Sequence, residues 1–223
     1  RLRKLRGLRL EKLLFRRLFD KGETMIIKTG TYTGNGVDNR AITGLGFAPK
    51  FVIIKSAGAV QGVCRTSFQP TTDQTKSLFS GSFTSTNRIH SMDADGFTLG
   101  TSSSVNSNTV VYYYWAVGAT ADVDCAVISW TGDGTDNRNI TGVGFQPDFL
   151  LFYGITGTAS TLRFRTSVMT GDIAGSLGTG NYDTDVIQSI SSDGFQVGTS
   201  QDSNESGTLY TCICLKFVTG LFG

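Results

Sequence analysis

One stretch of this chain is written twice, and this repeat constrains the fold more than any other feature. Residues 32–51 read YTGNGVDNRAITGLGFAPKF and residues 130–149 read WTGDGTDNRNITGVGFQPDF, with 13 of the 20 aligned positions identical. Shorter matches follow in the same order, at the sequences RTS, DGF and GTS. A solenoid repeat spans about 20–50 residues, which is far shorter than this period. We therefore predict a tandem duplication, with one domain at residues 25–119 and a second at residues 120–223.

Local patterns in both copies predict β-strands. Short apolar runs occur at residues 51–55 and 149–153, and a β-branched and aromatic run at residues 110–117 has its counterpart at residues 209–218. Glycine accounts for 28 of 223 residues and charged residues for only 17%, which suits short strands joined by many turns. The sequence predicts an all-β chain of two tandem jelly-roll-like β-sandwich domains.

The first 24 residues have a different composition and form a basic N-terminal arm. They hold nine Lys and Arg against three acidic residues, a net charge of +6, whereas the remaining residues carry −4. Leucines recur at helical intervals, so one interpretation is an amphipathic docking helix. A second is a basic arm that contacts nucleic acid or an acidic capsid surface. A third is translated upstream sequence, because residues 21–25 can be encoded by a purine-rich run before a start codon, with the native start at Met25.

Composition and motifs also exclude several classes of function. The chain has one histidine, so it cannot build a paired-histidine metal site or a two-histidine proton relay by itself. His90 has no Gly-x-Ser-x-Gly motif near it, and its counterpart falls near Gln188, so we interpret it as a surface or hydrogen-bonded strand residue. There is no run of about 18 apolar residues to span a membrane. We expect no enzymatic activity, no cofactor and no membrane segment.

The repeated motif Gly-Asx-Gly-x-Asp-Asn-Arg is the most specific pattern in the chain. Calcium prefers oxygen ligands spaced in this way, which makes Asp133 and Asp136 calcium candidates. An EF-hand would however need a glutamate where this chain has Gly144. We therefore predict a loop stabilised by Asx side chains, whose arginine pairs with its own aspartate or caps carbonyl groups. The structural residues of the motif are Asp38, Asn39 and Arg40 in the first copy and Asp136, Asn137 and Arg138 in the second.

An aromatic residue stands beside this loop in each copy, Tyr32 in the first and Trp130 in the second. An exposed ring flanked by Asn or Asp is a common sugar contact, because the ring stacks and the polar groups donate or accept hydrogen bonds. On this interpretation Tyr32 and Asn35, with Trp130 and Asp133, contact a glycan. The alternative is that each ring packs on the rim of its core.

The remaining candidates have structural interpretations. Asp95 and Asp193 each precede a glycine, a hairpin-turn pattern, which competes with the carboxylate pair of a glycosidase. Gly44 and Gly46 are expected to permit a tight turn or bulge before a strand. The cysteines lack zinc spacing and predict buried free thiols, with a bridge from Cys125 to one of the last two as the alternative. These cysteines are Cys64, Cys125, Cys212 and Cys214.

The combined pattern resembles a repeat domain of tailed-bacteriophage virion proteins. It reads G-[ND]-G-x-D-N-R-x-I-x-G-[LV]-G-F-x-P-x-F, then S-x-x-x-D-G-F-x-[LV]-G-T, then an aromatic strand, and it covers about residues 28–218. The resemblance implies a jelly-roll or lectin-like sandwich in a virion structural protein. It supplies no catalytic motif.

On this resemblance we expect a non-enzymatic virion protein, either a capsid decoration protein or a short head or tail fibre. Its partners would be other virion proteins and further copies of itself, and its location the virion, assembled in the bacterial host cytoplasm. The alternative is a carbohydrate-binding module of a tail fibre that binds a host surface glycan. Because the first copy is richer in aromatic and basic residues, we also predict that residues 28–118 anchor the protein and residues 122–218 face outward.

Overall fold

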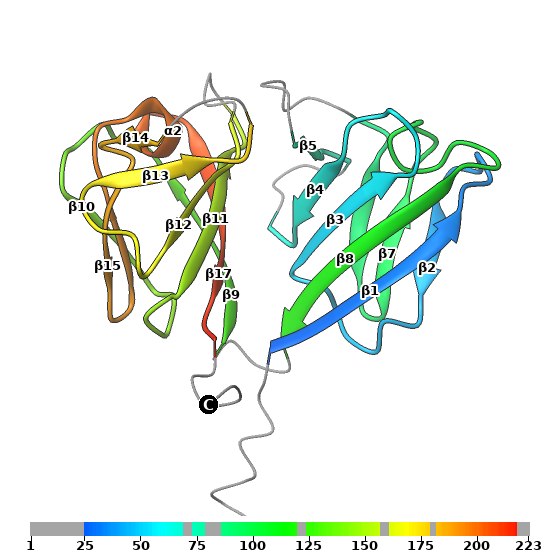
Figure 1. The fold of residues 1–223 in the computed structure, drawn as a ribbon, viewed down its shortest axis with the longest axis horizontal. Helices are drawn as coiled ribbons and strands as arrows, with labels where there is room; N and C mark the ends of the chain where they lie inside the picture. Colours follow the sequence, from blue (N-terminus) through cyan, green and yellow to red (C-terminus); the bar gives the residue numbers. More distant parts are fainter. Residues whose placement is uncertain are drawn as a thin grey trace, which may run out of the picture.

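The computed structural model describes residues 25–68, 73–78, 86–119, 124–156, 161–178 and 182–217. The basic arm lies outside the described residues. The chain forms two lobes, each a β-sandwich of a larger and a smaller antiparallel sheet (Figure 1). We call the described residues from 25 to 119 the first lobe and those from 124 to 217 the second lobe. The predicted all-β sandwich fold is confirmed.

The first lobe contains a five-stranded sheet with strand order β1-β8-β3-β4-β5 and a three-stranded sheet with order β2-β7-β6. The strands of the larger sheet are β1 (Met25–Thr33), β8 (Val111–Ala119), β3 (Phe51–Ser56), β4 (Val63–Thr66) and β5 (Lys76–Ser77). Those of the smaller sheet are β2 (Arg40–Thr43), β7 (Gly96–Leu99) and β6 (Ile89–Asp93).

The second lobe contains a six-stranded sheet with order β14-β13-β12-β11-β17-β9 and a three-stranded sheet with order β10-β16-β15. The larger sheet comprises β14 (Asp183–Thr184), β13 (Ile173–Ser176), β12 (Arg163–Thr166), β11 (Phe149–Gly154), β17 (Leu209–Leu215) and β9 (Cys125–Thr131). The smaller sheet comprises β10 (Arg138–Thr141), β16 (Gly194–Val197) and β15 (Ile187–Ser191), and the short helix α2 (Gln201–Asn204) precedes β17.

The two lobes have the same arrangement of strands. The pairs β2/β10, β3/β11, β6/β15 and β7/β16 begin and end 98 residues apart, and each strand has the corresponding neighbours in its sheet. The second lobe also has β14 and α2, which have no counterpart among the described residues of the first lobe. Equivalent residues of the two lobes can therefore be compared directly.

Each lobe has an apolar core between its two sheets, built by the alternation of side chains along the strands. Along β8, Tyr112, Tyr114 and Ala116 point into the first-lobe core, whereas Trp115 and Val117 point to the opposite face of the sheet. The equivalent strand β17 directs Tyr210, Cys212 and Cys214 into the second-lobe core.

A third apolar cluster joins the two lobes, because the outer faces of the two larger sheets pack against each other. It is reinforced by polar contacts: the Thr66 backbone N–H donates to Tyr153 Oη (3.2 Å), and the hydroxyls of Thr66 and Thr211 lie 3.1 Å apart. Figure 1 shows the larger sheets facing each other across this seam. The inter-lobe cluster consists of Phe51, Cys64, Val117, Cys125, Leu151, Tyr153, Ile155, Leu162, Ile213 and Leu215.

The aromatic strand of the first lobe does not form the contact surface that the sequence suggested. Tyr112 is fully buried, Tyr114 packs against the first-lobe core and Trp115 packs against the inter-lobe cluster. Of the four aromatic residues of this strand, only Tyr113 is exposed, at 54%. The basic residue Lys50 also contributes internally, donating to the Cys125 carbonyl across the seam (3.0 Å).

The four cysteines are free and buried, as predicted, and the alternative bridge from Cys125 is absent. Cys212 and Cys214 share one face of β17, with their sulfur atoms 3.6 Å apart. Burial raises the pKa of the Cys64 and Cys125 thiols to about 12, so both remain protonated near neutral pH. No helix among the described residues is both long and apolar enough to cross a bilayer.

Candidate functional site

The repeated Gly-Asx-Gly loop is folded around one buried asparagine in each lobe. In the first lobe the Asn106 side-chain N–H₂ donates to the carbonyls of Val37 (2.8 Å) and Gly100 (3.0 Å). Its Oδ1 accepts from Asn35 N and from Arg40 Nη1, both at 3.1 Å. All four hydrogen bonds that an amide can make are thus formed inside the lobe.

Asn204 makes the same four bonds in the second lobe, to the Thr135 and Gly198 carbonyls (2.8 and 2.9 Å) and from Asp133 N and Arg138 Nη1 (3.1 and 3.2 Å). Both asparagines are fully buried. Sequence reasoning missed these residues, although identity between the copies at positions 106 and 204 was the available signal.

The motif arginines cap carbonyl groups, as predicted. Arg40 Nη1 donates to the Thr33 carbonyl (2.5 Å), and Arg138 Nη1 donates to the Thr131 carbonyl (2.6 Å). Arg138 Nε also lies 3.3 Å from Asp133 Oδ2, so this arginine pairs with the first Asx residue of its loop.

The predicted glycan platform is wrong, because both aromatic rings are buried. Tyr32 is 9% exposed and donates from Oη to the Val105 carbonyl (2.7 Å), while its ring stacks on Tyr112. Trp130 is 6% exposed and donates from Nε1 to the Ser203 carbonyl (2.8 Å). Burial raises the pKa of Tyr32 well above its usual value. Each ring packs at the rim of its core, which was the alternative interpretation.

The flanking Asx residues serve the loop itself. Asn35 Oδ1 accepts from Val37 N (3.0 Å), and Asp133 Oδ1 accepts from the Thr135 backbone N–H (2.9 Å) and hydroxyl (2.6 Å). The hydrogen bonds from Thr135 lower the pKa of Asp133, and the charge of Arg138 adds to this effect. Asn35 and Asp133 thus hold the backbone of their own loops.

The calcium candidates do not form a metal site. Asp133 is engaged as above, while Asp136 accepts from Asn137 N (2.8 Å) and from Gln188 Nε2 (2.7 Å). Among the residues that the structure describes, no group of three or more His, Cys, Asp or Glu is arranged to hold a metal ion.

Asp95 and Asp193 are turn residues, as predicted, and each also fastens a second turn. Asp95 accepts from the backbone N–H groups of Gly44 (3.0 Å) and Gly46 (2.5 Å), and Asp193 accepts from the equivalent Gly142 and Gly144. Gly44 and Gly46 have φ values of 85° and 82°, a conformation that glycine adopts without strain. These backbone hydrogen bonds lower the pKa of both carboxyl groups.

In each lobe one arginine connects the larger sheet to the smaller one. The sequence analysis assigned these two arginines no role. Arg65 on β4 donates to the carbonyls of Gln74 (3.0 Å) and Ile89 (2.7 Å). Arg165 on β12 donates to the Ile187 carbonyl (2.8 Å) in the same manner. Both arginines are buried. The match of the RTS sequences between the copies was the signal that pointed to them.

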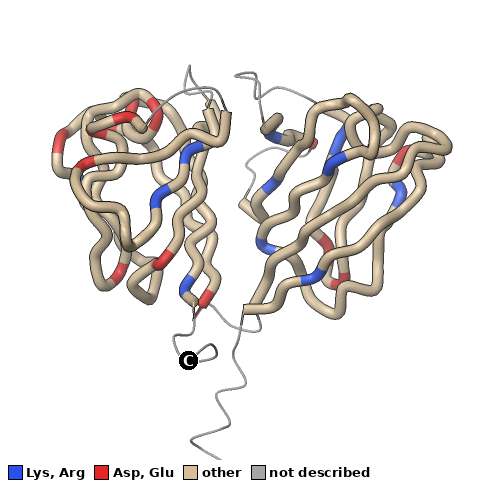
Figure 2. Tube along the Cα trace, in the orientation of Figure 1, with Lys and Arg blue, Asp and Glu red and all other residues tan. Residues whose placement is uncertain are grey.

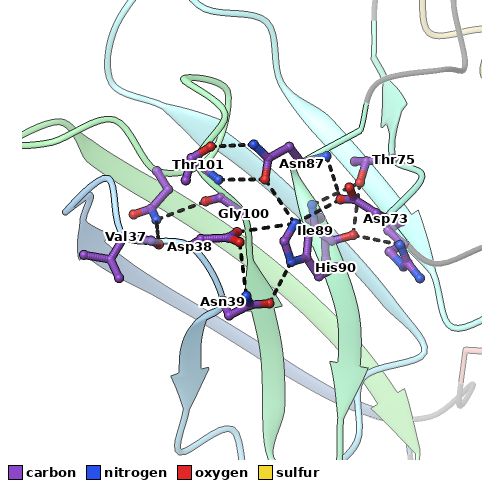
Figure 3. Close-up of polar contacts among 12 residues, drawn as sticks. Val37, Asp38, Asn39, Asp73, Thr75, Asn87, Ile89, His90, Gly100 and Thr101 are labelled. Carbon is purple, nitrogen blue, oxygen red and sulfur yellow. Dashed lines mark hydrogen bonds and ion pairs between the residues drawn. The ribbon is translucent and has the colours of Figure 1, made fainter.

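The first lobe also gathers polar side chains around its single histidine (Figure 3). His90 Nε2 lies 3.0 Å from Asp73 Oδ1, 3.3 Å from Asn87 Oδ1 and 3.8 Å from Asp38 Oδ1. Its Nδ1 lies 3.2 Å from Asn39 Oδ1. We call these five residues the His90 cluster. His90 is a hydrogen-bonded strand residue, as predicted, but its acidic neighbours were not expected because they lie far from it in sequence.

The comparisons with known proteins add one match. Residues 24–127 match the model of a domain of unknown function, DUF7483. The match covers the first lobe and the beginning of β9. No curated protein and no solved structure matches the chain.

Proposed function

We propose that this chain is a non-enzymatic structural protein of a bacteriophage virion, either a capsid decoration protein or a short head or tail fibre. The assignment to a virion rests on the resemblance of the repeated motifs to a repeat domain of bacteriophage virion proteins. The structural observation that best supports a non-enzymatic structural role is that the polar side chains of these motifs stabilise the fold itself. In both lobes their polar side chains hold backbone groups in place, as Asn106 and Asn204 do. Motifs used in this way build a rigid scaffold.

The inter-lobe cluster supports a compact building block. Its residues lie on the strands of both larger sheets or directly beside them and are at most 4% exposed, so the two sandwiches are held together by a shared apolar seam. A block of this kind suits broad contacts with other virion proteins, including further copies of the chain. The alternative function, glycan binding, required exposed rings at Tyr32 and Trp130, and both rings are buried. We therefore do not propose it.

The charge distribution supports an orientation on the particle. Residues 25–119 contain seven basic and four acidic residues, whereas residues 120–223 contain four basic and eleven acidic residues. Figure 2 shows this acidic character on the second lobe. We propose that the first lobe contacts the particle and the second lobe faces solvent. This orientation rests on the charge of the two lobes, because the aromatic residues of β8 are largely buried.

Mass spectrometry of gradient-purified phage particles tests the virion assignment. We expect the chain at a fixed ratio to the major capsid protein, and we expect that ratio to persist through a second purification. A non-structural phage protein from the same infected cells is the control, since it should disappear on purification. Absence of the chain from purified particles would contradict the proposal.

Hydroxyl-radical footprinting of the intact chain, free and on particles, tests the orientation. Tyr113 in the first lobe and Tyr182 in the second are matched probes, because they are 54% and 61% exposed. We expect Tyr113 to be protected on the particle and Tyr182 to remain reactive. Protection of Tyr182 alone would reverse the orientation.

A further inference from the structure

His90 is surrounded by oxygen atoms that accept hydrogen bonds. Asn87 is fixed in orientation because its Oδ1 accepts from Thr101 N (3.2 Å) while its Nδ2 donates to the Thr101 hydroxyl. Asn39 is fixed because its Nδ2 donates to Asp38 Oδ2 (3.1 Å). Both asparagines therefore present oxygen to the imidazole, one to each ring nitrogen.

This environment matches a protonated imidazole better than a neutral one. The imidazolium has two N–H donors, whereas neutral imidazole has one donor and one acceptor. In the neutral form, one ring nitrogen would direct its lone pair at an acceptor oxygen. Protonation removes this mismatch and places a positive charge beside Asp73 and Asp38.

The charged groups around the ring come from three separate segments. Asp38 lies in the loop between β1 and β2, and Asp73 precedes β5, while His90 itself is on β6. Asp73 is held further by accepting from Asn87 N (2.6 Å). The neighbouring cation is Arg65 on β4, which bonds the Gln74 and Ile89 carbonyls and interacts electrostatically with Asp73.

The second lobe has an uncharged residue at the equivalent position. Gln188 Nε2 donates to Asp136 Oδ1 (2.7 Å) and Asp185 Oδ1 (3.2 Å). Asp136 is the counterpart of Asp38. The second lobe therefore makes a comparable link between the loop and the strand β15, but with a side chain that does not titrate.

We propose that His90 is a proton-dependent clasp that fastens the loop of residues 34–40 and residues 73–75 to the strand β6. The clasp is closed by the imidazolium and loosened when the ring loses its proton. Histidine is the side chain whose charge can change between about pH 5 and pH 8, so we expect the clasp to respond to pH within that range. The second lobe has no such response in this range. This inference does not depend on the virion assignment.

Amide hydrogen exchange of the full chain at about pH 5.5 and about pH 7.5, corrected for the intrinsic rate, tests the clasp. We expect the amides of residues 35–39 to be about fivefold better protected at the lower pH, since a single ion pair of this kind contributes about 1 kcal/mol. Residues 133–137 are the internal control and should show no such gain. Equal behaviour of the two loops would overturn the proposal.

Two substitutions sharpen the test. His90→Gln copies the second lobe and should abolish the gain in protection while leaving the thermal unfolding temperature at about pH 7.5 unchanged. Gln188→His places an imidazole between Asp136 and Asp185 and should create a gain in residues 133–137. A persistent gain in His90→Gln would refute the clasp.

The single histidine also gives one Hε1 signal in proton NMR, and the chemical shift of this signal reports the charge of the ring. We expect this signal to change over the same pH range as the protection of residues 35–39. A ring that keeps one charge state across that range would overturn the proposal.

Discussion

The two lobes have the same residue at several positions where a side chain hydrogen-bonds to backbone groups. They have different residues at other positions, where the side chain faces the inter-lobe cluster or solvent. Asn106 and Asn204 make the same four bonds. By contrast, exposed Lys55 in the first lobe corresponds to fully buried Tyr153 in the second. The comparison teaches that identity between the copies marks the framework of each sandwich. The differing positions carry the specialisation.

The edge of the larger sheet shows the same division. In the first lobe Cys64 on β4 lies opposite Lys76 on β5, whereas in the second lobe Phe164 lies opposite Gly175. A Cβ atom on Gly175 would come within 2.4 Å of the Phe164 ring. One lobe thus buries a lysine beside a thiol, and the other fills the equivalent space with an aromatic ring.

Among equivalent positions of the two lobes, alanine substitution at Tyr153 and at Lys55 should give the largest difference in the free energy of unfolding. Tyr153→Ala removes a fully buried ring from the inter-lobe cluster and should lower the free energy of unfolding by about 4 kcal/mol. Lys55→Ala should change it by less than about 0.5 kcal/mol, because this side chain is exposed. Urea unfolding of the intact chain measures both.

Tyr153→Phe is the matched control, since it keeps the ring and removes the hydroxyl that accepts from Thr66 N. Its cost should be about 1 kcal/mol. Equal costs for Tyr153→Ala and Lys55→Ala would show that the seam contributes little to stability.

The buried asparagines should give equal effects in the two lobes. Asn106→Ala or Asn204→Ala removes the side-chain partner of two carbonyls and a backbone N–H and one of the hydrogen bonds of the motif arginine, which should cost about 3 kcal/mol in either lobe. Thermal unfolding of the two variants checks this. Asn106→Asp keeps the shape but sets an acceptor oxygen against the Val37 and Gly100 carbonyls, so it should cost at least as much as alanine. If only one of the two alanine substitutions destabilised the protein, the buried asparagines would not have equivalent roles in the two lobes.

The fold class followed from the sequence because strand patterns and turn residues are local signals. The runs at residues 51–55 and 149–153 became β3 and β11, and the Asp95 and Asp193 turns appeared where expected. The buried free thiols followed from cysteine spacing and type.

Contacts between segments that are distant in the sequence could not be predicted from local sequence patterns. The burial of Tyr32 and Trp130 depends on Val105 and Ser203, which lie 73 residues away in each case. The inter-lobe cluster could not be read from either copy alone, because it depends on how the copies pack. The His90 cluster joins Asp38, Asp73 and His90, which no sequence motif relates.

Lys76 should make the stability of the first lobe depend on alkaline pH. Burial lowers the pKa of this lysine to about 8, and electrostatic interactions with Cys64 and Asp202 oppose this shift. Because the folded-state value lies below the ordinary value of about 10.4, protonation favours unfolding. Stability should therefore rise as the pH increases from about 8 to about 10.4.

Lys76→Met removes the buried charge and should raise the free energy of unfolding at about pH 7 by about 1 kcal/mol. The gain should shrink toward pH 10, where the wild-type lysine is neutral in the folded state. Denaturant unfolding at both pH values measures it. Lys55→Met is the control, because this lysine is exposed and its effect should not vary with pH in this way. A destabilised Lys76→Met protein would indicate that the electrostatic interactions of Lys76 outweigh the cost of its burial.

The smallest expected difference lies in the loops, at Asn35 and Asp133. Both cap the backbone N–H two residues later, but only Asp133 titrates. Its pKa is lowered by the bonds from Thr135, so its contribution is present above the ordinary carboxyl range, about pH 4, and is lost as the pH falls through the lowered value. Amide exchange at about pH 3 should therefore show slight loosening of residues 133–137 relative to residues 35–39. Asp133→Asn copies the first lobe and should remove this difference, whereas Asn35→Asp should transfer it. If Asn35→Asp leaves the first loop insensitive to acid, the carboxylate is not what makes the two loops differ.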